Sequence, residues 1–242
     1  MRLITPEWPA PESVQAISTT RQGGVSQGAW AECNLGVHCG DEPSAVAANR
    51  AALAERTPEP PRWLQQVHGR RVVHLDDWHE GIEADGAWTD RPGSVAVILS
   101  ADCLPILLAD RRGTLVMALH GGWRGLAAGI IPAAIEALPV SATQLVAWLG
   151  PAIGPDWFEV GAEVRSAFTR LDPAHAASFA PNAAGRFQAD LKAVASRQLA
   201  AAGVGTVFDS GLCNAADAEC FYSHRRDGGR TGRMATLIWL AT

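Results

Sequence analysis

Three residues of types that bind zinc, His68, Cys103 and His120, each stand at the end of an apolar run. The strings are LQQVHG at 64–69, VAVILSADCLP at 95–105 and LVMALHGGWRG at 115–125. Two imidazoles and one thiolate suit Zn²⁺, and three protein ligands leave a fourth position open, which is typical of a catalytic zinc. A lone histidine is more often a packed or hydrogen-bonded residue, so the prediction depends on all three sharing one kind of context.

Asp102 directly precedes Cys103. Neighbours in a strand point to opposite faces, so Asp102 reaches the same pocket only if the strand ends there, and Pro105 favours such an end. Asp102 then either moves protons or orients a group that does. The alternative is that its carboxylate caps the turn after the strand, and the local sequence favours neither role.

Arg124 follows His120 by four residues, within the string GGWRG. An arginine and exposed N–H groups at a helix start suit an anion such as a substrate phosphate or carboxylate. The alternative is a surface cap. Arg21 in TTRQGGVS and Asn34 in CNLG stand in glycine-rich loops where a backbone can approach a ligand, which makes them candidate substrate contacts.

The segment 223–233, SHRRDGGRTGR, concentrates four arginines among glycines before a final apolar run. Such a loop either binds phosphate or is held in place by ion pairs, and the sequence leaves both open.

Composition restricts the class of protein. The chain has 242 residues, is 48% hydrophobic and carries a net charge of -5, so it can bury a core as one large domain or two small ones. No basic excess points to nucleic acid, and no apolar run approaches a membrane span. The first ten residues lack the features of a signal peptide. The five cysteines form no C-x-x-C pair, which indicates a reducing, cytoplasmic location.

Short apolar runs predict strands at 14–19, 95–100, 115–119, 145–149, 204–208 and 234–240. Helical spacing predicts helices at 44–56, 126–138, 161–171 and 191–202, the last with Asp190 as N-cap and Gly203 as stop. Strands and helices are interspersed, yet several strands follow one another with only loops between. This order favours an α+β or layered α/β domain with mixed sheets.

Several strings resemble one family along most of the chain, from about residue 19 to 240. They are TTRQGGVS, NLGVHCGD, QVHG, ADG, SADCLPILLAD, ALHGGWRGLAAGI, LGPAIGP, FEVGAEV, DLKAVA and RRDGGRTGRMATLIWL. The family is named variously multicopper polyphenol oxidase (laccase-like), YfiH-type purine nucleoside phosphorylase, and peptidoglycan editing factor. Two strings depart from its pattern: Gly121 stands where alanine is usual, and near Cys213 the sequence reads CNAAD where many members carry a C-T-Y-C-type string.

The resemblance implies a layered α/β/β/α fold of mixed sheets, with residues 1–242 as a single domain. It places the family's metal ligands on His68, Cys103 and His120. It also implies zinc-dependent phosphorolysis of adenosine, inosine, guanosine and methylthioadenosine, with adenosine deaminase activity. Arg124, and Arg21 with it, would hold phosphate.

Two other activities remain as alternatives. The first is an amidase that edits a UDP-MurNAc-L-Ser peptidoglycan precursor, through metal-activated water or through Cys103 as nucleophile with His120 as base. The second is a copper-dependent phenol oxidase. Copper is disfavoured because trinuclear copper centres use His-x-His pairs, and the seven histidines form none. We expect a monomer that acts on small molecules and binds neither nucleic acid nor membranes.

Overall fold

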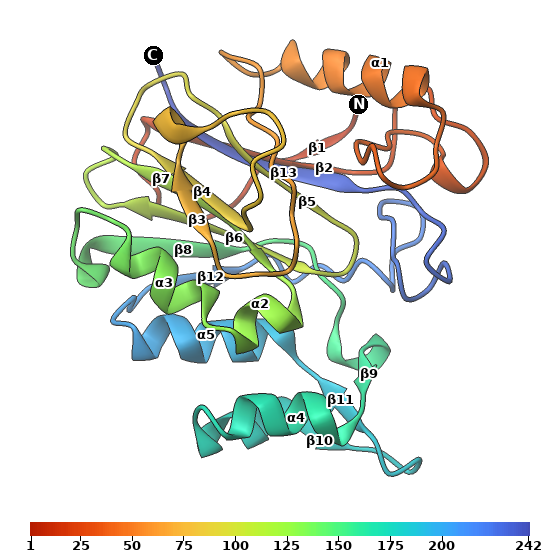
Figure 1. The fold of residues 1–242 in the computed structure, drawn as a ribbon, viewed down its shortest axis with the longest axis vertical. Helices are drawn as coiled ribbons and strands as arrows, with labels where there is room; N and C mark the ends of the chain where they lie inside the picture. Colours follow the sequence, from red (N-terminus) through yellow and green to blue (C-terminus); the bar gives the residue numbers. More distant parts are fainter.

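Two large β-sheets form the centre of the protein. The computed structural model describes residues 1–242. One sheet contains β1 Leu3–Ile4, β2 Val14–Thr19, β5 Ala96–Ser100 and β13 Met234–Leu240, and the other contains β3 Val72–His74, β4 Gly86–Thr89, β6 Leu104–Asp110, β7 Val116–Gly121, β8 Leu145–Leu149 and β12 Val207–Asp209. Their strand orders are β1-β2-β13-β5 and β12-β8-β6-β7-β4-β3. The two sheets lie one above the other in Figure 1.

The six-stranded sheet is mixed. Strand β12 runs parallel to β8 and β3 runs parallel to β4, whereas β8, β6, β7 and β4 are antiparallel neighbours. The four-stranded sheet is antiparallel throughout.

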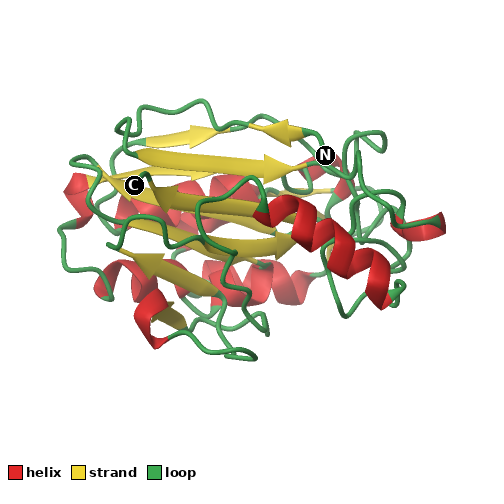
Figure 2. Cartoon of the chain, turned by 90° about the horizontal axis from the view of Figure 1, so that it is seen from above, coloured by secondary structure: helices red, strands yellow, loops and turns green.

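Helices cover the outer faces of both sheets. Helix α1 (Pro43–Ala54) lies on the four-stranded sheet, and α2 (Trp123–Ala127), α3 (Ile130–Glu136) and α5 (Leu191–Ala201) lie on the six-stranded sheet. Viewed from above in Figure 2, the strands lie between the helices. The predicted α/β/β/α layering is confirmed.

A smaller unit lies beyond α5. Helix α4 (Ala162–Thr169) packs there with a three-stranded sheet of β9 (Glu159–Val160), β10 (Phe179–Pro181) and β11 (Phe187–Ala189). Short 3₁₀ helices occupy Gly28–Trp30, Leu75–Asp77, Ala142–Gln144, Pro155–Trp157 and Pro173–Ser178. No helix has the length and apolar character needed to cross a bilayer.

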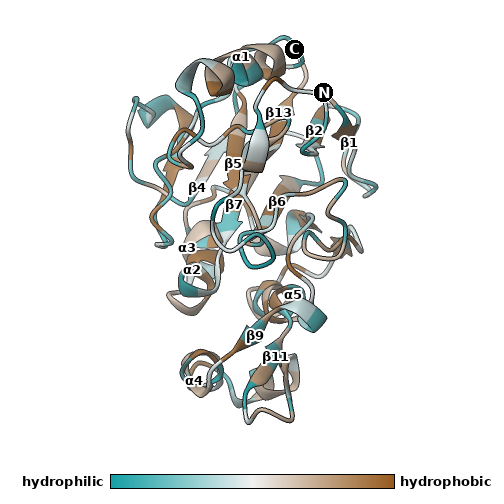
Figure 3. Ribbon diagram, turned by 90° about the vertical axis from the view of Figure 1, so that its right-hand side faces the viewer, coloured by the Kyte–Doolittle hydropathy of each residue, from teal (hydrophilic) through white to brown (hydrophobic).

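Alternation along the strands explains the layers. In β6, Leu107 and Ala109 belong to a core between the two sheets, together with Ile238 of β13. Ile106 and Leu108 point the other way, into the core beneath the helices. Successive side chains of a strand point to opposite faces, so a strand buried on both sides reads as a continuous apolar run. Figure 3 shows β5 and β6 mainly in the brown of hydrophobic residues.

Most predicted elements are present. Strands β2, β8 and β13 have the predicted bounds, and Asp190 caps α5 by accepting a hydrogen bond from the N–H of Ala193. Gly203 follows that helix at φ 97°.

Other elements differ from the prediction. The predicted helix 126–138 is wrong, because Gly129 adopts a left-handed conformation at φ 87° and separates α2 from α3. Strand β6, which contains Pro105, lies outside the predicted set of strands, as do β1, β3, β4, β9, β10 and β11. The second position of Pro105 in β6, near the strand start, makes the proline tolerable.

Candidate metal centre

The sheet and one loop bring the three predicted ligands together. Cys103 directly precedes β6 and His120 lies in β7, and the two strands are paired so that Pro105 faces His120. His68 comes from the loop before β3. One ligand atom from each residue lies within 4.8 Å of the others. This is a candidate His–Cys–His metal site, and no other such cluster occurs in the structure.

The side chains are close without being in covalent contact. The Sγ of Cys103 is 3.8 Å from Nε2 of His68. The rings of His68 and His120 meet edge to face, with centroids 4.7 Å apart and an interplanar angle of 75°. His68 is exposed, Cys103 is partly buried and His120 is buried. The cluster therefore opens to solvent on the side of His68, where a fourth ligand can enter.

Gly122 keeps the space beside the ligands free. A Cβ at this position would lie 2.8 Å from Cδ2 of His68, 3.3 Å from Sγ of Cys103 and 3.5 Å from Cε1 of His120. The backbone of Gly122, at φ -66° and ψ 150°, is one that any residue adopts. Its lack of a side chain is therefore required by the ligands and not by the chain conformation. A borderline-soft cation fits both the donor set and this space.

The carboxylate of Asp85 accepts hydrogen bonds from the loop of His68 and from the ring of His120. Its carboxylate accepts hydrogen bonds from the N–H groups of Val67 (3.2 Å), His68 (2.9 Å) and Gly69 (2.6 Å). It also accepts one from Nδ1 of His120 at 2.8 Å. Asp85 is fully buried. Burial raises the pKa of its carboxyl, but the hydrogen bonds from His120 and from the loop outweigh burial and keep the pKa below its ordinary value.

Backbone strain is confined to residues beside the ligands. Among non-glycine residues, only His68 (φ 59°) and Asp102 (φ 84°) have positive φ. Such conformations cost energy and persist where surrounding contacts impose them. Both positions belong to the site, which supports the view that this region is built for function.

The electrostatics of the cluster favour a thiolate. Burial raises the pKa of Cys103, but the neighbouring His120 and His68 outweigh it and lower the pKa to about 6. Burial lowers the pKa of His120, whereas Cys103 and Asp85 raise it, to about 9. Both shifts favour a thiolate beside an imidazolium in the metal-free site. A metal ion would bind these side chains in their deprotonated forms.

Asp102 lies beside the metal ligands and is nearly buried. Its Oδ2 accepts a hydrogen bond of 2.7 Å from the N–H of Arg225, and its Oδ1 is buried without a partner. Burial raises the pKa of this carboxyl. The arrangement ties the site to the C-terminal loop.

That loop holds itself together through its arginines. Arg226 binds the carboxylate of Asp227 and donates to the carbonyls of Asn214 and Phe221. Arg225 donates to the carbonyl of Glu159. Segment 223–233 is thus held by one ion pair, Arg226–Asp227, and by arginine hydrogen bonds to backbone carbonyls.

Arg124 lies on the exposed side of α2, two positions after Gly122. Its guanidinium stacks on the ring of Trp123, 4.7 Å from the ring centroid. The helix has only five residues, because it ends before Gly129, so it offers a weaker N-terminal dipole than the predicted helix of 126–138.

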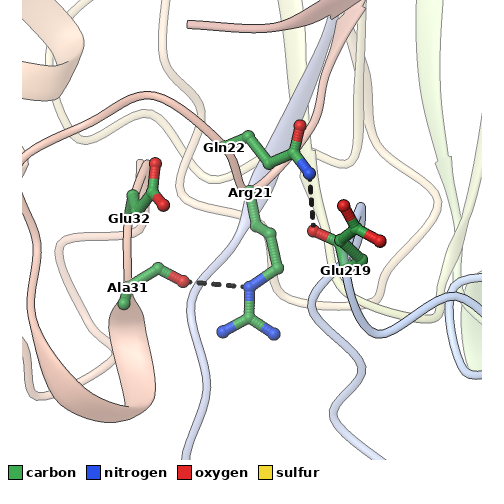
Figure 4. A pocket seen from close by; sticks show the side chains of 5 residues that line it. All are labelled: Arg21, Gln22, Ala31, Glu32 and Glu219. Atoms are coloured by element: carbon green, nitrogen blue, oxygen red, sulfur yellow. Dashed lines mark hydrogen bonds between the residues drawn. The ribbon is translucent and has the colours of Figure 1, made fainter.

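Arg21 lies in a different pocket, of about 570 Å³, lined by Arg21, Gln22, Ala31, Glu32 and Glu219. Figure 4 shows its Nε donating to the carbonyl of Ala31, at 2.9 Å. Its Nη1 donates to Ala218, and its guanidinium stacks on Tyr222. None of the three candidate metal ligands lines this pocket.

Asn34 is fully buried and takes part in a network of loop contacts. Its Oδ1 accepts hydrogen bonds from the N–H groups of Gly36 and Arg233, and its Nδ2 donates to Asp41. The structure thus joins His68, Cys103 and His120. Asp102 is next to Cys103 in the chain, but its carboxylate contacts the segment of Arg225, so its predicted role in proton transfer stays a prediction. The structure places Arg21 and Asn34 among loop contacts, where their predicted substrate role stays a prediction.

The sequence reasoning missed Asp85. The residue stands in the short string ADG before β4, and it is 35 positions from His120, its side-chain partner. The string ADG is one of those that resemble the family, but a lone acidic residue between small ones carries no spacing that predicts its role.

Comparisons with known proteins find relatives over nearly the whole chain. The family model described as "Multi-copper polyphenol oxidoreductase laccase" matches residues 15–241. A protein of Pseudomonas aeruginosa named purine nucleoside phosphorylase is 49% identical over 238 residues, covering 98% of each chain. The Escherichia coli purine nucleoside phosphorylase YfiH is 44% identical over 242 residues, covering 99% of each.

Solved structures show the same fold. Neisseria meningitidis protein NMB0706 matches with a TM-score of 0.97 and 43% identity over all of both chains. YlmD from Geobacillus stearothermophilus matches with a TM-score of 0.91 and 31% identity, covering 98% of this chain and 94% of the other.

Proposed function

The chain belongs to the multi-copper polyphenol oxidoreductase laccase family, and within that family we propose that it is a zinc-dependent purine nucleoside phosphorylase. The observation that carries the proposal is the cluster of His68, Cys103 and His120 with an open fourth side. The names of relatives that are 44–49% identical over nearly the whole chain supply the substrate class. The substrates we propose are adenosine, inosine, guanosine and methylthioadenosine, with inorganic phosphate.

Zinc is our choice of metal, on the chemistry of the donors. His68 and His120 each offer an imidazole nitrogen and Cys103 offers a thiolate, a set that zinc accepts in tetrahedral sites. Zinc, when bound, acts as a Lewis acid that polarises an oxygen of the reactants. The open side at His68 admits the reactants, while Gly122 leaves the ligand rings free to converge.

In phosphorolysis a phosphate oxygen forms a bond to C1′ of the ribose while the bond from C1′ to the purine nitrogen breaks. The purine leaves with the electron pair of that bond and takes up a proton, and ribose 1-phosphate remains. We assign the movement of this proton to Asp102. In support, Asp102 directly precedes Cys103 in the chain, and its carboxylate is fixed on one oxygen by the N–H of Arg225.

Arg124 is our candidate for the phosphate contact. It follows the ligand segment on an exposed helix, and its planar guanidinium can donate two parallel hydrogen bonds to phosphate. Arg21 and Asn34 remain our proposed substrate contacts after Arg124. Their side chains already form hydrogen bonds within the protein's own loops.

We propose deamination of adenosine at the same site as a second activity. In that reaction water forms a bond to C6 of the purine, the bond from C6 to the amino nitrogen breaks, and the nitrogen takes up a proton and leaves as ammonia, so that inosine remains. The same three ligands and Asp102 would serve it. We further propose that residues 1–242 act as one domain in a cytoplasmic monomer. One core cluster of 28 residues joins the six-stranded sheet to the small unit around α4, which supports a single domain.

A second candidate function is the amidase reaction on a peptidoglycan precursor, with Cys103 as nucleophile. The observation that favours it is the thiol beside His68 and His120. As a zinc ligand, the thiolate should resist alkylation until a chelator removes the metal. Rapid alkylation of the metal-loaded protein, unchanged by chelator, would support the nucleophile instead.

The decisive experiment combines metal analysis with an assay. Purified protein is analysed for zinc and copper, then incubated with adenosine in the presence and absence of phosphate. We expect one zinc per chain, with adenine and ribose 1-phosphate forming only when phosphate is present, and neither product with His120→Ala. Stoichiometric copper with phenol oxidation and no phosphorolysis would overturn the proposal.

A further inference from the structure

One buried carboxylate contacts both histidines of the metal centre. Asp85 receives four hydrogen bonds, three from successive N–H groups at 67–69 and one from the ring of His120. Its own carbonyl accepts a fifth, of 2.8 Å, from the N–H of His120. The residue precedes β4, which pairs with β7. Asp85 therefore links the loop of one ligand to the strand of another.

The four side-chain hydrogen bonds are divided equally between the two carboxylate oxygens of Asp85. Oδ1 accepts from the N–H of His68 and from Nδ1 of His120, at 2.9 and 2.8 Å. Oδ2 accepts from the N–H groups of Val67 and Gly69, at 3.2 and 2.6 Å. Three successive N–H groups around one anion form a nest, which a left-handed residue makes possible. The left-handed residue here is His68 itself.

We propose that Asp85 is the positioning residue of the metal centre, holding the loop of His68 in its left-handed form and His120 in the tautomer whose Nε2 is free for the metal. This role rests on the metal centre proposed above. Asp85 is not one of the clustered ligands, and each of its carboxylate oxygens already accepts two hydrogen bonds from N–H groups. Partners of this kind fix the ring orientation of a histidine ligand.

The chemistry of the carboxylate explains why a substitute would fail. Asparagine keeps the size of aspartate but has one acceptor oxygen and an NH₂ group. That NH₂ would face either the N–H groups of the loop or Nδ1–H of His120, and donor would meet donor. An asparagine at this position therefore cannot accept hydrogen bonds both from the N–H groups of the loop and from His120. Glutamate is one methylene longer in a fully buried place.

The test measures zinc affinity by competition with a chromophoric chelator, using zinc alone as probe. We expect Asp85→Asn to weaken zinc binding by about 10- to 100-fold, the range found for partners of metal ligands. Asp110→Asn is the matched control. Asp110 is an equally buried carboxylate that accepts several hydrogen bonds elsewhere in the same sheet, and its change should leave zinc affinity as in the wild type.

A second measurement needs no variant and decides the matter even if Asp85→Asn does not fold. ¹⁵N NMR of zinc-loaded wild type should show a protonated, hydrogen-bonded Nδ1 on His120 and a metal-bound Nε2. A metal-bound Nδ1 would overturn the proposal, as would wild-type zinc affinity in Asp85→Asn. A wild-type protein that binds no zinc at all refutes the metal centre, whereas unaltered affinity in the variant refutes the positioning role alone.

Discussion

The hairpin of β6 and β7 has two ends, and each end has a fully buried aspartate. At the turn, Asp110 accepts hydrogen bonds from the N–H and hydroxyl of Thr114 and from the N–H of Leu115. At the open end, Asp85 accepts from the loop of His68 and from the ring of His120. Both carboxylates use the same physical device, a charged acceptor surrounded by N–H groups.

The two ends differ in where the donors come from. The donors to Asp110 are four and five positions away in the chain, so that carboxylate stabilises a turn. The donors to Asp85 are as far as 17 and 35 positions away, so it fixes the relative place of separate segments. Local bonding serves stability, whereas distant bonding sets the geometry of a site. The predictions below test this division.

Loss of a ligand at the open end should have the largest effect. We expect Cys103→Ala to weaken zinc binding by more than 100-fold, about 3 kcal/mol, since one of four ligand positions is lost. His68→Ala and His120→Ala should behave alike. Zinc content after dialysis against a weak chelator measures the effect. Full zinc occupancy in any of these variants would remove that residue from the site.

Sequence alone predicted much of the fold, for a physical reason. Strands such as β8 and β13 are buried on both faces, so their apolar runs are continuous and their bounds visible. The helix 126–138 was predicted as one because an apolar face continues through Gly129. Only the left-handed backbone of that glycine reveals the break.

The candidate site could be predicted in part. His68, Cys103 and His120 shared a context at the ends of apolar runs, and residue type alone suggested a metal. Asp85 could not be found this way, because its partners are brought to it by pairing of β4 with β7 and by a loop. Tertiary hydrogen bonds to a lone aspartate leave no periodic signal in a sequence.

A substitution of Arg124 tests whether this residue, near the open end of the hairpin, contacts the phosphate of the reaction. We expect Arg124→Lys to weaken phosphorolysis by about 1.5–3 kcal/mol, the scale of a charge-assisted hydrogen bond, because lysine lacks the planar fork. Zinc content should not change, and deamination of adenosine should lose less. The comparison is kcat/KM for the two reactions. Equal losses in both would show that Arg124 is not a phosphate contact.

At the turn, loss of the carboxylate should affect stability and not the metal. We expect Asp110→Ala to lower the free energy of unfolding by about 2 kcal/mol, because it leaves buried donors without an acceptor. Zinc affinity should equal that of the wild type. Urea unfolding of wild type and variant measures the loss of stability, and a zinc titration of both proteins measures the metal affinity. Weakened zinc binding would contradict the division between the ends of the hairpin.

Gly122 offers a smaller change at the open end. In Gly122→Ala the new methyl would lie 2.8 Å from Cδ2 of His68, so that ring must move. We expect about a tenfold loss of zinc affinity, corresponding to about 1.4 kcal/mol. Gly205→Ala is the control, because a Cβ there meets nothing within 4 Å. If both variants bind zinc like the wild type, the space beside the ligands is wider than the structure shows.

The smallest effect we expect is a pH dependence at the turn end. Burial raises the pKa of Asp110, but hydrogen bonds from Leu115 and Thr114 outweigh it and lower the pKa in the folded protein. A lowered folded pKa means that the ionised form is the one stabilised by folding. That stability is fully present above the unfolded pKa of about 3.9 and is lost as the pH falls through the lower folded value. The difference in unfolding free energy between wild type and Asp110→Asn should therefore be constant from pH 5 to 7 and shrink below about pH 4. Urea unfolding at a series of pH values measures it. A difference that grows with acid would mean that folding stabilises the protonated carboxyl, and the turn would then depend on a neutral hydrogen bond.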